Sequence, residues 1–358
     1  MDLMTVLGET VTKRLCDLRW AVRDSVICFL QQLLQSPTDV LCGWFKCHSL
    51  HLRLLECVDD GESFVQASAL SALVDISKQQ ELWEDLLQQT GQTELALLEA
   101  LIDYIHADSQ GFARRATVCT YTKWLMVFSW LLSGLPGKGQ GLPDNATVDG
   151  QLQKSSEETN TRPEELVVAT RIRKAISTAV FDLDWEVKHG ALEFWQTLIE
   201  TYVPVRIDGR LPEANRKNEQ DDKEELKMSK QNLCEDRNDP AKSMLNLMQF
   251  LEEEALITKL VQVLEDEDRT VAVRACQMLL SIQGILRSEI ASNLIDVSHS
   301  ETVKFMKKTK GELEGMKLQG ILEVKTRVID GYEQHPLSLL QDILAGTEVN
   351  NCNILDCY

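Results

Sequence analysis

Apolar residues recur at three- and four-residue spacing along most of the chain. This spacing is clearest in the stretches 40–58, 82–105, 164–180 and 243–264. It is the period of an α-helix with one buried face, so the sequence predicts helices there. The same pattern predicts a shorter helix over 1–16, a long one over 301–332 and a short one over 336–344.

Five blocks in the chain share one pattern. Each begins with an Asp, has Val or Ala five residues later and a polar or basic residue next: Asp17/Val22/Arg23, Asp60/Val65/Gln66, Asp108/Ala113/Arg114, Asp182/Val187/Lys188 and Asp268/Val273/Arg274. The residue two places further on is small in each block: Ser25, Ser68, Ala116, Gly190 and Cys276. Such self-similarity indicates a repeat protein.

Each block predicts the start of the second helix in an antiparallel helical pair. The Asp carboxylate can accept backbone N–H groups that the first helical turn leaves unpaired. The Val begins the buried stripe, and the basic residue points toward the turns, where it can pair with the Asp of an adjacent block. The residues expected to build the repeat in this way are Asp17, Arg23, Asp60, Asp108, Arg114, Asp182, Lys188, Asp268 and Arg274.

The intervals between the block Asp residues are 43, 48, 74 and 86, and they resemble the HEAT-repeat unit of roughly 40 to 47 residues once two insertions are removed. The fold class expected is all-α, a HEAT/armadillo-like α-solenoid of about five helical pairs. Its predicted regions are repeats 1–3 (1–133), a flexible linker (134–163), repeat 4 (164–203), a charged disordered insertion (204–242), repeat 5 with carboxyl-terminal helices (243–345) and an extended tail (346–358).

The charge balance argues against several functions. The chain has 37 Lys and Arg against 56 Asp and Glu, a net charge of −19, so it should repel nucleic-acid phosphates, and protein partners are expected instead. No apolar run approaches the roughly 18 to 20 residues of a membrane span. The ten cysteines have no small-domain spacing, which favours a reduced intracellular chain.

Candidate chemistry inside the helical region is sparse. Five possible metal ligands lie along one predicted helix at spacings that favour ordinary core residues over a zinc site: Cys42, Cys47, His48, His51 and Cys57. The basic stretch around Lys304 and Lys308 favours a solvated helix face over an import signal. No catalytic constellation is recognisable, so the chain is expected not to be an enzyme and to carry no cofactor of its own.

The last residues are chemically distinctive. The peptide 350–358 ends on apolar and metal-binding groups, where a solvated tail is normally polar. The thiolate of Cys357 and the α-carboxylate of Tyr358 are both good zinc donors. Ile354 and Leu355 could anchor the peptide in an apolar groove while Tyr358 fills a pocket. The alternative is an ordinary tail that ends in arbitrary residues.

The five blocks and the terminus Asn351-Cys-Asn-Ile-Leu-Asp-Cys-Tyr358 together resemble the carboxyl-terminal part of the family of the breast-cancer-protein-associated activator of the ATM kinase. This resemblance implies a non-enzymatic HEAT-repeat scaffold in the nucleus and cytoplasm, with a role in the DNA-damage response through ATM-type kinases. It also implies binding to the Integrator endonuclease and its inactive paralogue during assembly of that complex.

The resemblance further implies how the tail acts. Cys357 would coordinate zinc that belongs to the partner endonuclease, and Asp356 and Tyr358 would line the contact, so that the tail plugs the active site. A different function stays open on the residues alone. A generic solenoid adaptor or kinase regulator would bind its partner through the concave face of the repeats and not through the tail.

Overall fold

The computed structural model describes residues 3–106, 111–132, 163–202, 240–288, 291 and 301–334. Every regular element in these ranges is helical, which confirms the all-α fold class. The chain divides into two compact units, Met1–Leu256 and Ile257–Tyr358. We describe each unit by itself.

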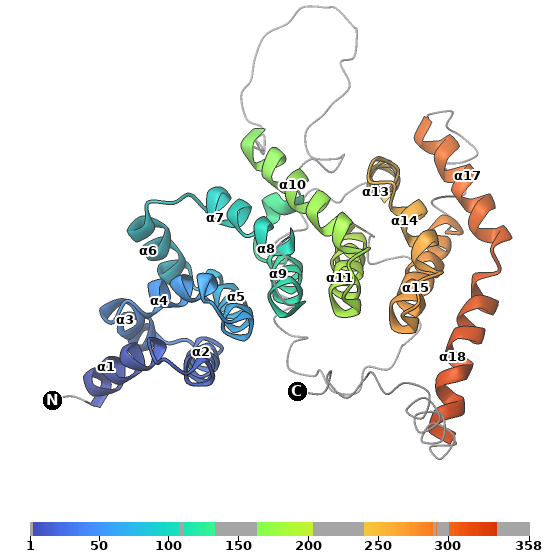
Figure 1. The fold of residues 1–358 in the computed structure, drawn as a ribbon. Coiled ribbons are helices and arrows are strands. Elements are labelled where there is room, and N and C mark those ends of the chain that lie inside the picture. Colours follow the sequence, from blue (N-terminus) through green and yellow to red (C-terminus); the bar gives the residue numbers. More distant parts are fainter. Residues whose placement is uncertain are drawn as a thin grey trace, which may run out of the picture. The chain divides into compact units, whose positions relative to one another are not determined.

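Helices of the first unit alternate between two layers (Figure 1). One layer holds the second helices of the pairs: α2 (Trp20–Leu34), α5 (Ser63–Ser77), α9 (Gly111–Trp124) and α11 (Trp185–Tyr202). The other holds the first helices: α1 (Leu3–Leu15), α3 (Asp39–Cys47), α4 (Leu50–Glu56), α6 (Gln80–Thr90), α7 (Glu94–Ala100), α8 (Ile102–His106), α10 (Pro163–Ala179) and α13 (Pro240–Glu253). Two 3-10 turns, η1 (Cys57–Asp59) and η2 (Ser129–Leu132), complete the unit.

The second helices form a continuous row. Helix α2 packs on α5, α5 on α9 and α9 on α11. Each contributes apolar side chains at helical spacing, and the largest fully buried ones in the row include Tyr121, Trp124, Phe194 and Trp195. Burial of a large side chain of this kind stabilises a fold by about 1.5–3 kcal/mol. The row is therefore the hydrophobic core of the first unit, repeated along one direction.

The first helices are more broken than the sequence predicts. Only 164–180 is one helix, as expected. The expected helix 40–58 ends at Cys47 and restarts at Leu50, because Ser49 adopts a left-handed backbone conformation. The expected helix 82–105 is split into α6, α7 and α8, with Gly91 left-handed after α6. The expected helix 243–264 is interrupted at Ala255, which also has a positive φ angle.

The second unit contains α15 (Arg269–Leu286), α17 (Glu301–Gly315) and α18 (Leu318–Gln334), together with most of α14 (Leu256–Val263). Helix α15 packs against α17 and α18. The long helix expected over 301–332 is two helices, because Lys317 has a positive φ angle between them. Two buried polar groups of α15 reach this corner: Gln283 Nε2 donates to the carbonyl of Leu313 at 2.9 Å, and Cys276 Sγ lies 3.4 Å from that of Leu318.

The fifth block begins two residues earlier than the sequence predicts. Asp266 Oδ1 accepts the N–H of Asp268 at 2.9 Å, as Asp182 Oδ1 accepts that of Asp184 at 2.8 Å in the fourth block. The fully buried Val271 of α15 then corresponds to Val187 of α11. Asp268 therefore caps α15, and Arg274 takes the place of the small Gly190. Asp266 and Asp268 lie two residues apart, and so do Val271 and Val273. The five-residue spacing from Asp to Val is therefore compatible with both registers.

Two contacts fix the chain just before residue 133. The carboxylate of Glu94 accepts the indole N–H groups of both Trp83, at 2.9 Å, and Trp130, at 2.5 Å. Arg173, buried on α10, donates to the carbonyl of Leu131 at 3.2 Å. Both segments expected to be disordered, the linker 134–163 and the charged insertion 204–242, lie almost wholly outside the described residues. Helix α13 begins at Pro240, just inside the second of them.

Candidate functional site

Adjacent repeats of the first unit are joined by two-point ion pairs. Arg23 of α2 donates from Nε and Nη2 to the carboxylate of Asp60, at 2.7 and 2.6 Å. Arg114 of α9 donates in the same way to Asp182, at 3.0 and 3.1 Å. All four side chains are at most 16% exposed. The basic residue of one block thus binds the Asp of the next, as the pattern predicts.

The block Asp residues also organise the turns before the second helices. Asp17, Asp60 and Asp182 each accept the N–H of the residue two places later, at 3.1, 2.9 and 2.8 Å. Hydrogen bonds of this kind satisfy donors that the helix itself leaves free. The hydrogen bonds from the N–H of Arg19 and from its guanidinium group lower the pKa of Asp17.

Asp184 is a second acidic residue that the sequence pattern did not single out. Its Oδ1 accepts the N–H groups of Glu186 and Val187, at 2.9 and 3.3 Å, and so caps α11. Its Oδ2 lies 2.6 Å from Nη2 of Arg115. Burial raises the pKa of Asp184, but the hydrogen bonds from Arg115 and from Val187 outweigh this and hold the pKa below its usual value.

The other residues of the block pattern differ in their contacts and in their location on the helices. Gln66 stands where its neighbours have Arg, and its side chain donates to the carbonyl of Asp60 at 2.7 Å. Lys188 is half-buried on α11. Asp268 caps α15 by accepting the N–H groups of Thr270 and Val271, and Arg274 lies further along that helix. Asp108 lies outside the described residues.

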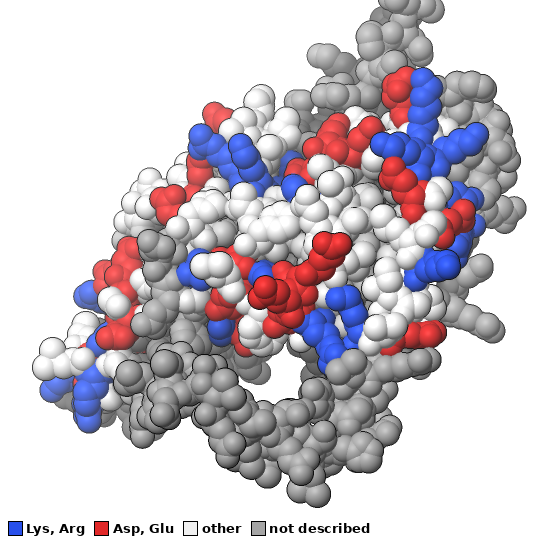
Figure 2. Space-filling view, turned by 45° about the vertical axis from the view of Figure 1, so that its right-hand side comes forward, with Lys and Arg blue, Asp and Glu red and all other residues white. Residues whose placement is uncertain are grey.

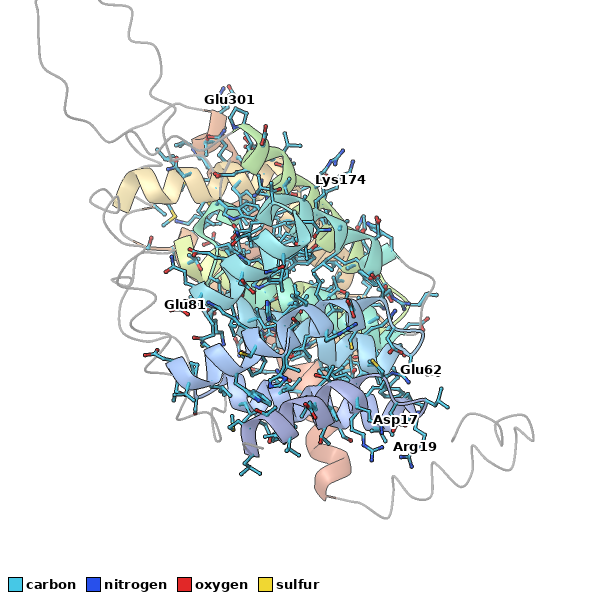
Figure 3. All side chains as sticks on the ribbon, turned by 90° about the vertical axis from the view of Figure 1, so that its left-hand side faces the viewer. Asp17, Arg19, Glu62, Glu81, Lys174 and Glu301 are labelled. Atoms are coloured by element: carbon cyan, nitrogen blue, oxygen red, sulfur yellow. The ribbon has the colours of Figure 1, made fainter. Side chains whose placement is uncertain are left out.

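Exposed apolar side chains gather at the edge where the blocks begin. Leu18 and Leu183, each directly after a block Asp, are 99% and 100% exposed, and Phe181 is half-exposed. Trp20 stacks on Phe64 with ring centroids 5.1 Å apart, and Phe64 lies 4.2 Å from Phe112. Figure 3 shows Asp17, Arg19 and Glu62 together on this edge, away from Glu81. Exposed apolar groups beside charged ones are typical of protein-binding surfaces.

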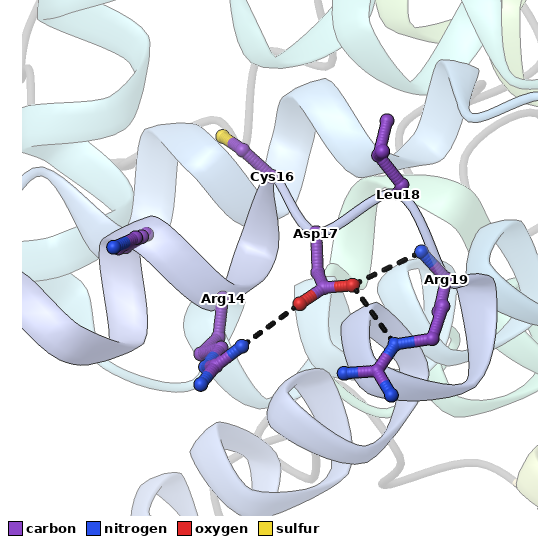
Figure 4. Close-up of a pocket in the computed structure, with 6 residues that line it drawn as sticks. Arg14, Cys16, Asp17, Leu18 and Arg19 are labelled. Atoms are coloured by element: carbon purple, nitrogen blue, oxygen red, sulfur yellow. Dashed lines mark hydrogen bonds and ion pairs between the residues drawn. The ribbon is translucent and has the colours of Figure 1, made fainter.

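The hollow at the first turn is occupied by its own charges. It has a volume of about 550 Å³ and is lined by Lys13, Arg14, Cys16, Asp17, Leu18 and Arg19. Asp17 pairs with Arg14 at 3.0 Å and with Arg19 at 3.3 Å (Figure 4). The single carboxylate is therefore shared by two guanidinium groups, which order this turn.

The cysteines and histidines that were considered as possible metal ligands occupy ordinary positions in the helices. Cys42 and Cys57 are buried thiols, as expected, whereas Cys47 is exposed. His51 is buried, and its Nε2 lies 2.8 Å from Oδ2 of Asp85. Burial lowers the pKa of His51 more than Asp85 raises it. Within the described ranges, no three His, Cys, Asp or Glu side chains are placed to hold a metal ion.

Charges of both signs are interspersed elsewhere. On the face in Figure 2, Lys and Arg lie among Asp and Glu. In the basic stretch, Lys304 pairs with Glu301 at 2.6 Å and Lys308 with Glu312 at 3.8 Å, the arrangement expected of a solvated helix face. In the part of the chain that the structure describes, no helix is long and apolar enough to span a membrane.

The tail residues predicted to bind a partner, Ile354, Leu355, Asp356, Cys357 and Tyr358, lie outside the described residues. So does the short helix expected over 336–344. The sequence pattern missed Arg115 and Asp184. The signal that could have found Asp184 is an acidic residue two places after the block Asp, which recurs as Glu62, Asp184 and, in the fifth block, Asp268.

Solved repeat proteins share a loose likeness with the chain. A designed armadillo repeat protein in complex with the peptide (KR)4 is 13% identical, with a TM-score of 0.40 over 85% of this chain and 98% of that chain. An engineered protein is 11% identical, with a TM-score of 0.43 over 88% of this chain and 100% of that chain.

Two curated relatives align along the whole chain. "Integrator complex assembly factor BRAT1" of Mus musculus is 27% identical over 391 residues, and that of Danio rerio is 24% identical over 397 residues. Both alignments cover 100% of this chain and 40% and 41% of the relatives. The chain thus spans about two fifths of their length.

The profile of one protein family matches residues 2–130 and 151–315. These ranges contain all five blocks and include parts of both units of the fold. They cover well over half of the sequence, so this chain belongs to the family described as Integrator complex assembly factor BRAT1.

Proposed function

We propose that this chain is a non-enzymatic scaffold that binds the Integrator endonuclease and its inactive paralogue during assembly, and that its carboxyl-terminal tail plugs the endonuclease active site. Membership of a family of Integrator assembly factors supports the scaffold role. The composition of residues 350–358 carries the plug, because a terminal thiol and carboxylate stand next to two apolar anchors.

The chemistry of the plug rests on the partner's metal ions. Two zinc ions about 3.5–4 Å apart can generate and hold an attacking hydroxide. A thiolate from Cys357 that coordinates this zinc would take the place of the hydroxide, since a metal deprotonates a coordinating thiol. Asp356 and Tyr358 would line the contact. The chain then needs no zinc or other cofactor of its own.

The repeats supply the second component of this function. A rigid row of helix pairs offers an extended binding surface. Once this surface has bound the partner, binding of the linked tail to the active site is intramolecular. The effective concentration of a linked peptide can be in the millimolar range. Removal of the tail would therefore weaken active-site inhibition more than it weakens the complex. By family resemblance, we extend the proposal to ATM-type kinases in the DNA-damage response and to the nucleus and cytoplasm.

The deciding experiment changes the tail only. Cys357→Ser, and separately one Gly added after Tyr358, should each reduce binding to the purified endonuclease heterodimer and relieve its inhibition. Cys352→Ser is the matched control, because it alters a thiol in the same peptide. Helical content measured by circular dichroism should be unchanged in all three. Unchanged affinity and inhibition in both tail variants would disprove the plug.

The exposed edge favours a second candidate, a general adaptor or kinase regulator that binds through its repeats. Leu18, Trp20 and Leu183 give such a protein an apolar contact surface that does not involve the tail. Deletion of residues 346–358 distinguishes the two functions. Partners recovered by affinity purification should persist under the second candidate, whereas the endonuclease should be lost or left active under the first.

A further inference from the structure

Helix α17 carries a basic face in a chain that is otherwise acidic. Residues 303–311 contain four Lys and neither Asp nor Glu, although the whole chain has a charge of −19, and no stretch of nine residues elsewhere in the sequence is as basic. Lys304, Lys307 and Lys308 follow at three- and four-residue spacing, so they share one side of the helix. All three are exposed, and the side chains of Lys304 and Lys308 are 66% and 74% exposed.

This lysine face lies opposite the side of α17 that packs in the second unit. Helix α17 contacts α15, and its buried residues are Val303, Met306, Thr309 and Leu313. Helical spacing puts these four on the side away from the three lysines. Repeat helices pack on one another through apolar stripes, and the lysine face has none. The face is therefore a surface of the repeat protein and not a contact between repeats.

Two glycines continue the lysine face toward the end of the helix. Gly311 and Gly315 lie three and seven residues after Lys308, on the same side. Both are exposed, and a Cβ atom on either would meet open space. Glycine inside a helix is less favourable than alanine, and no neighbour in the described structure requires it here. Without side chains, these positions let the backbone of another chain approach closely.

The lysines are only weakly engaged by their own helix. Lys304 pairs with Glu301 at 2.6 Å and Lys308 with Glu312 at 3.8 Å. Exposed pairs of this kind contribute little to stability, because water screens both charges. Lys307 has no ion pair with any residue that the structure describes. The three ammonium groups can thus bind carboxylates of a partner at little cost to the fold.

We infer that the lysine face of α17 binds an acidic helix of a partner protein. Carboxylates at three- and four-residue spacing on a partner helix match the spacing of the three lysines. The glycines beside them leave room for the helix itself. A nucleic acid fits less well, because its dense phosphates would meet Glu301, Glu312 and the negative charge of the whole chain. The inference is independent of the tail and of the endonuclease active site.

The test uses the full chain and a fluorescently labelled model peptide. A peptide of Glu and Ala of about 20 residues, long enough to form a helix, carries Glu at three- and four-residue spacing. In about 50 mM salt, fluorescence anisotropy should give a dissociation constant below about 100 µM, and added salt should raise it. The combined variant Lys304→Glu, Lys307→Glu and Lys308→Glu should raise it about tenfold or more. The same peptide with Gln in place of Glu should not bind.

A matched variant separates the lysine face from net charge. Lys13→Glu, Lys123→Glu and Lys174→Glu together change three exposed lysines on other helices. The net charge then equals that of the α17 variant, but the affinity for the peptide should stay near the native value. Thermal unfolding of both variants shows that they are folded. Equal losses of affinity in the two variants would overturn the inference.

A change at Gly311 tests the close approach. Gly311→Leu puts a side chain on the lysine face without changing its charge, so it should weaken peptide binding several-fold, whereas the melting temperature should not fall. A native chain that does not bind the acidic peptide overturns the inference. So does a chain that binds poly(U) RNA through the three lysines but leaves the peptide free, because the face would then belong to a nucleic acid.

Discussion

Arg114 binds Asp182 through two hydrogen bonds, although 68 residues separate them in the sequence. Arg23 makes the same contact with Asp60, which is only 37 residues away. The contact between adjacent repeats is thus the same whether or not a long insertion lies between them. These pairs therefore report on repeat stacking more directly than the sequence intervals do.

Loss of one partner should destabilise the first unit. In Arg114→Ala the partly buried carboxylate of Asp182 loses both side-chain donors, so we expect a loss of about 1–3 kcal/mol in the free energy of unfolding. Urea unfolding followed by tryptophan fluorescence measures it. Arg19→Ala is the control, because loss of that exposed pair should change the free energy of unfolding much less. Equal losses in the two variants would show that Arg114 has no special role.

Two glycines should respond oppositely to the same substitution. A Cβ atom on Gly8 would lie 2.3 Å from Cδ2 and Nε2 of His48, whereas a Cβ atom on Gly43 has open space. Gly43→Ala should therefore stabilise the fold by about 0.5–1 kcal/mol through its helix propensity. Gly8→Ala should destabilise it, and His48→Ala should rescue that variant. The melting temperatures decide the matter, and a rise in both single variants would contradict the close packing at Gly8.

The stability of the first unit should fall as the solution is acidified below neutrality. The pKa of buried His51 is lowered from its ordinary value of 6.5, mainly by burial, so the folded chain holds it neutral while the unfolded chain takes up a proton. Its contribution is present above that ordinary value and is lost as the pH drops toward the lower folded pKa.

His51→Gln should flatten this dependence between about pH 7 and about pH 5. Asp85 and Lys46 face the ring and remain in the variant, so the difference between the two profiles isolates His51. His106→Gln, which alters an exposed histidine, should keep the native profile. The measurement is the urea midpoint at each pH, and parallel profiles for native and His51→Gln chains would rule the effect out.

The register of the fifth block can be checked through its cap. Asp268→Ala removes the acceptor for two N–H groups at the start of α15 and should cost about 0.5–2 kcal/mol, whereas Asp268→Asn should preserve most of the cap. Hydrogen exchange in the first turn of α15 reports the change locally. Glu267→Ala, an exposed neighbour, should have little effect. Protection that is unaltered in Asp268→Ala would refute this register.

The helical repeat could be predicted because its signals are physical requirements. A carboxylate at the turn, a Val five residues later and a basic residue after it satisfy the open N–H groups, begin the core and join the repeats. The breaks in the expected helices could not be foreseen at Ser49, Ala255 and Lys317, since none of these residue types normally favours a positive φ angle. At Gly91 the signal was present, because glycine is the usual residue in that conformation.

The sequence predicted that the basic residue of one block pairs with the Asp of an adjacent block, but it did not predict the role of Arg115. Its contacts with Asp184 and Glu186 depend on how close α9 and α11 approach one another, which no spacing within one block specifies. That approach is set in part by Gly190, where a Cβ atom would lie 3.3 Å from Cγ1 of Val118.

The Glu94 carboxylate binds Trp83 and Trp130, and Arg173 donates a hydrogen bond to Leu131. These contacts fix the position of the chain just before its long insertion. The helices on either side are joined by contacts of their own. Residues can thus be gained or lost in that insertion during evolution without shifting the neighbouring repeats, and an experimenter can place a tag or a cleavage site there for the same reason.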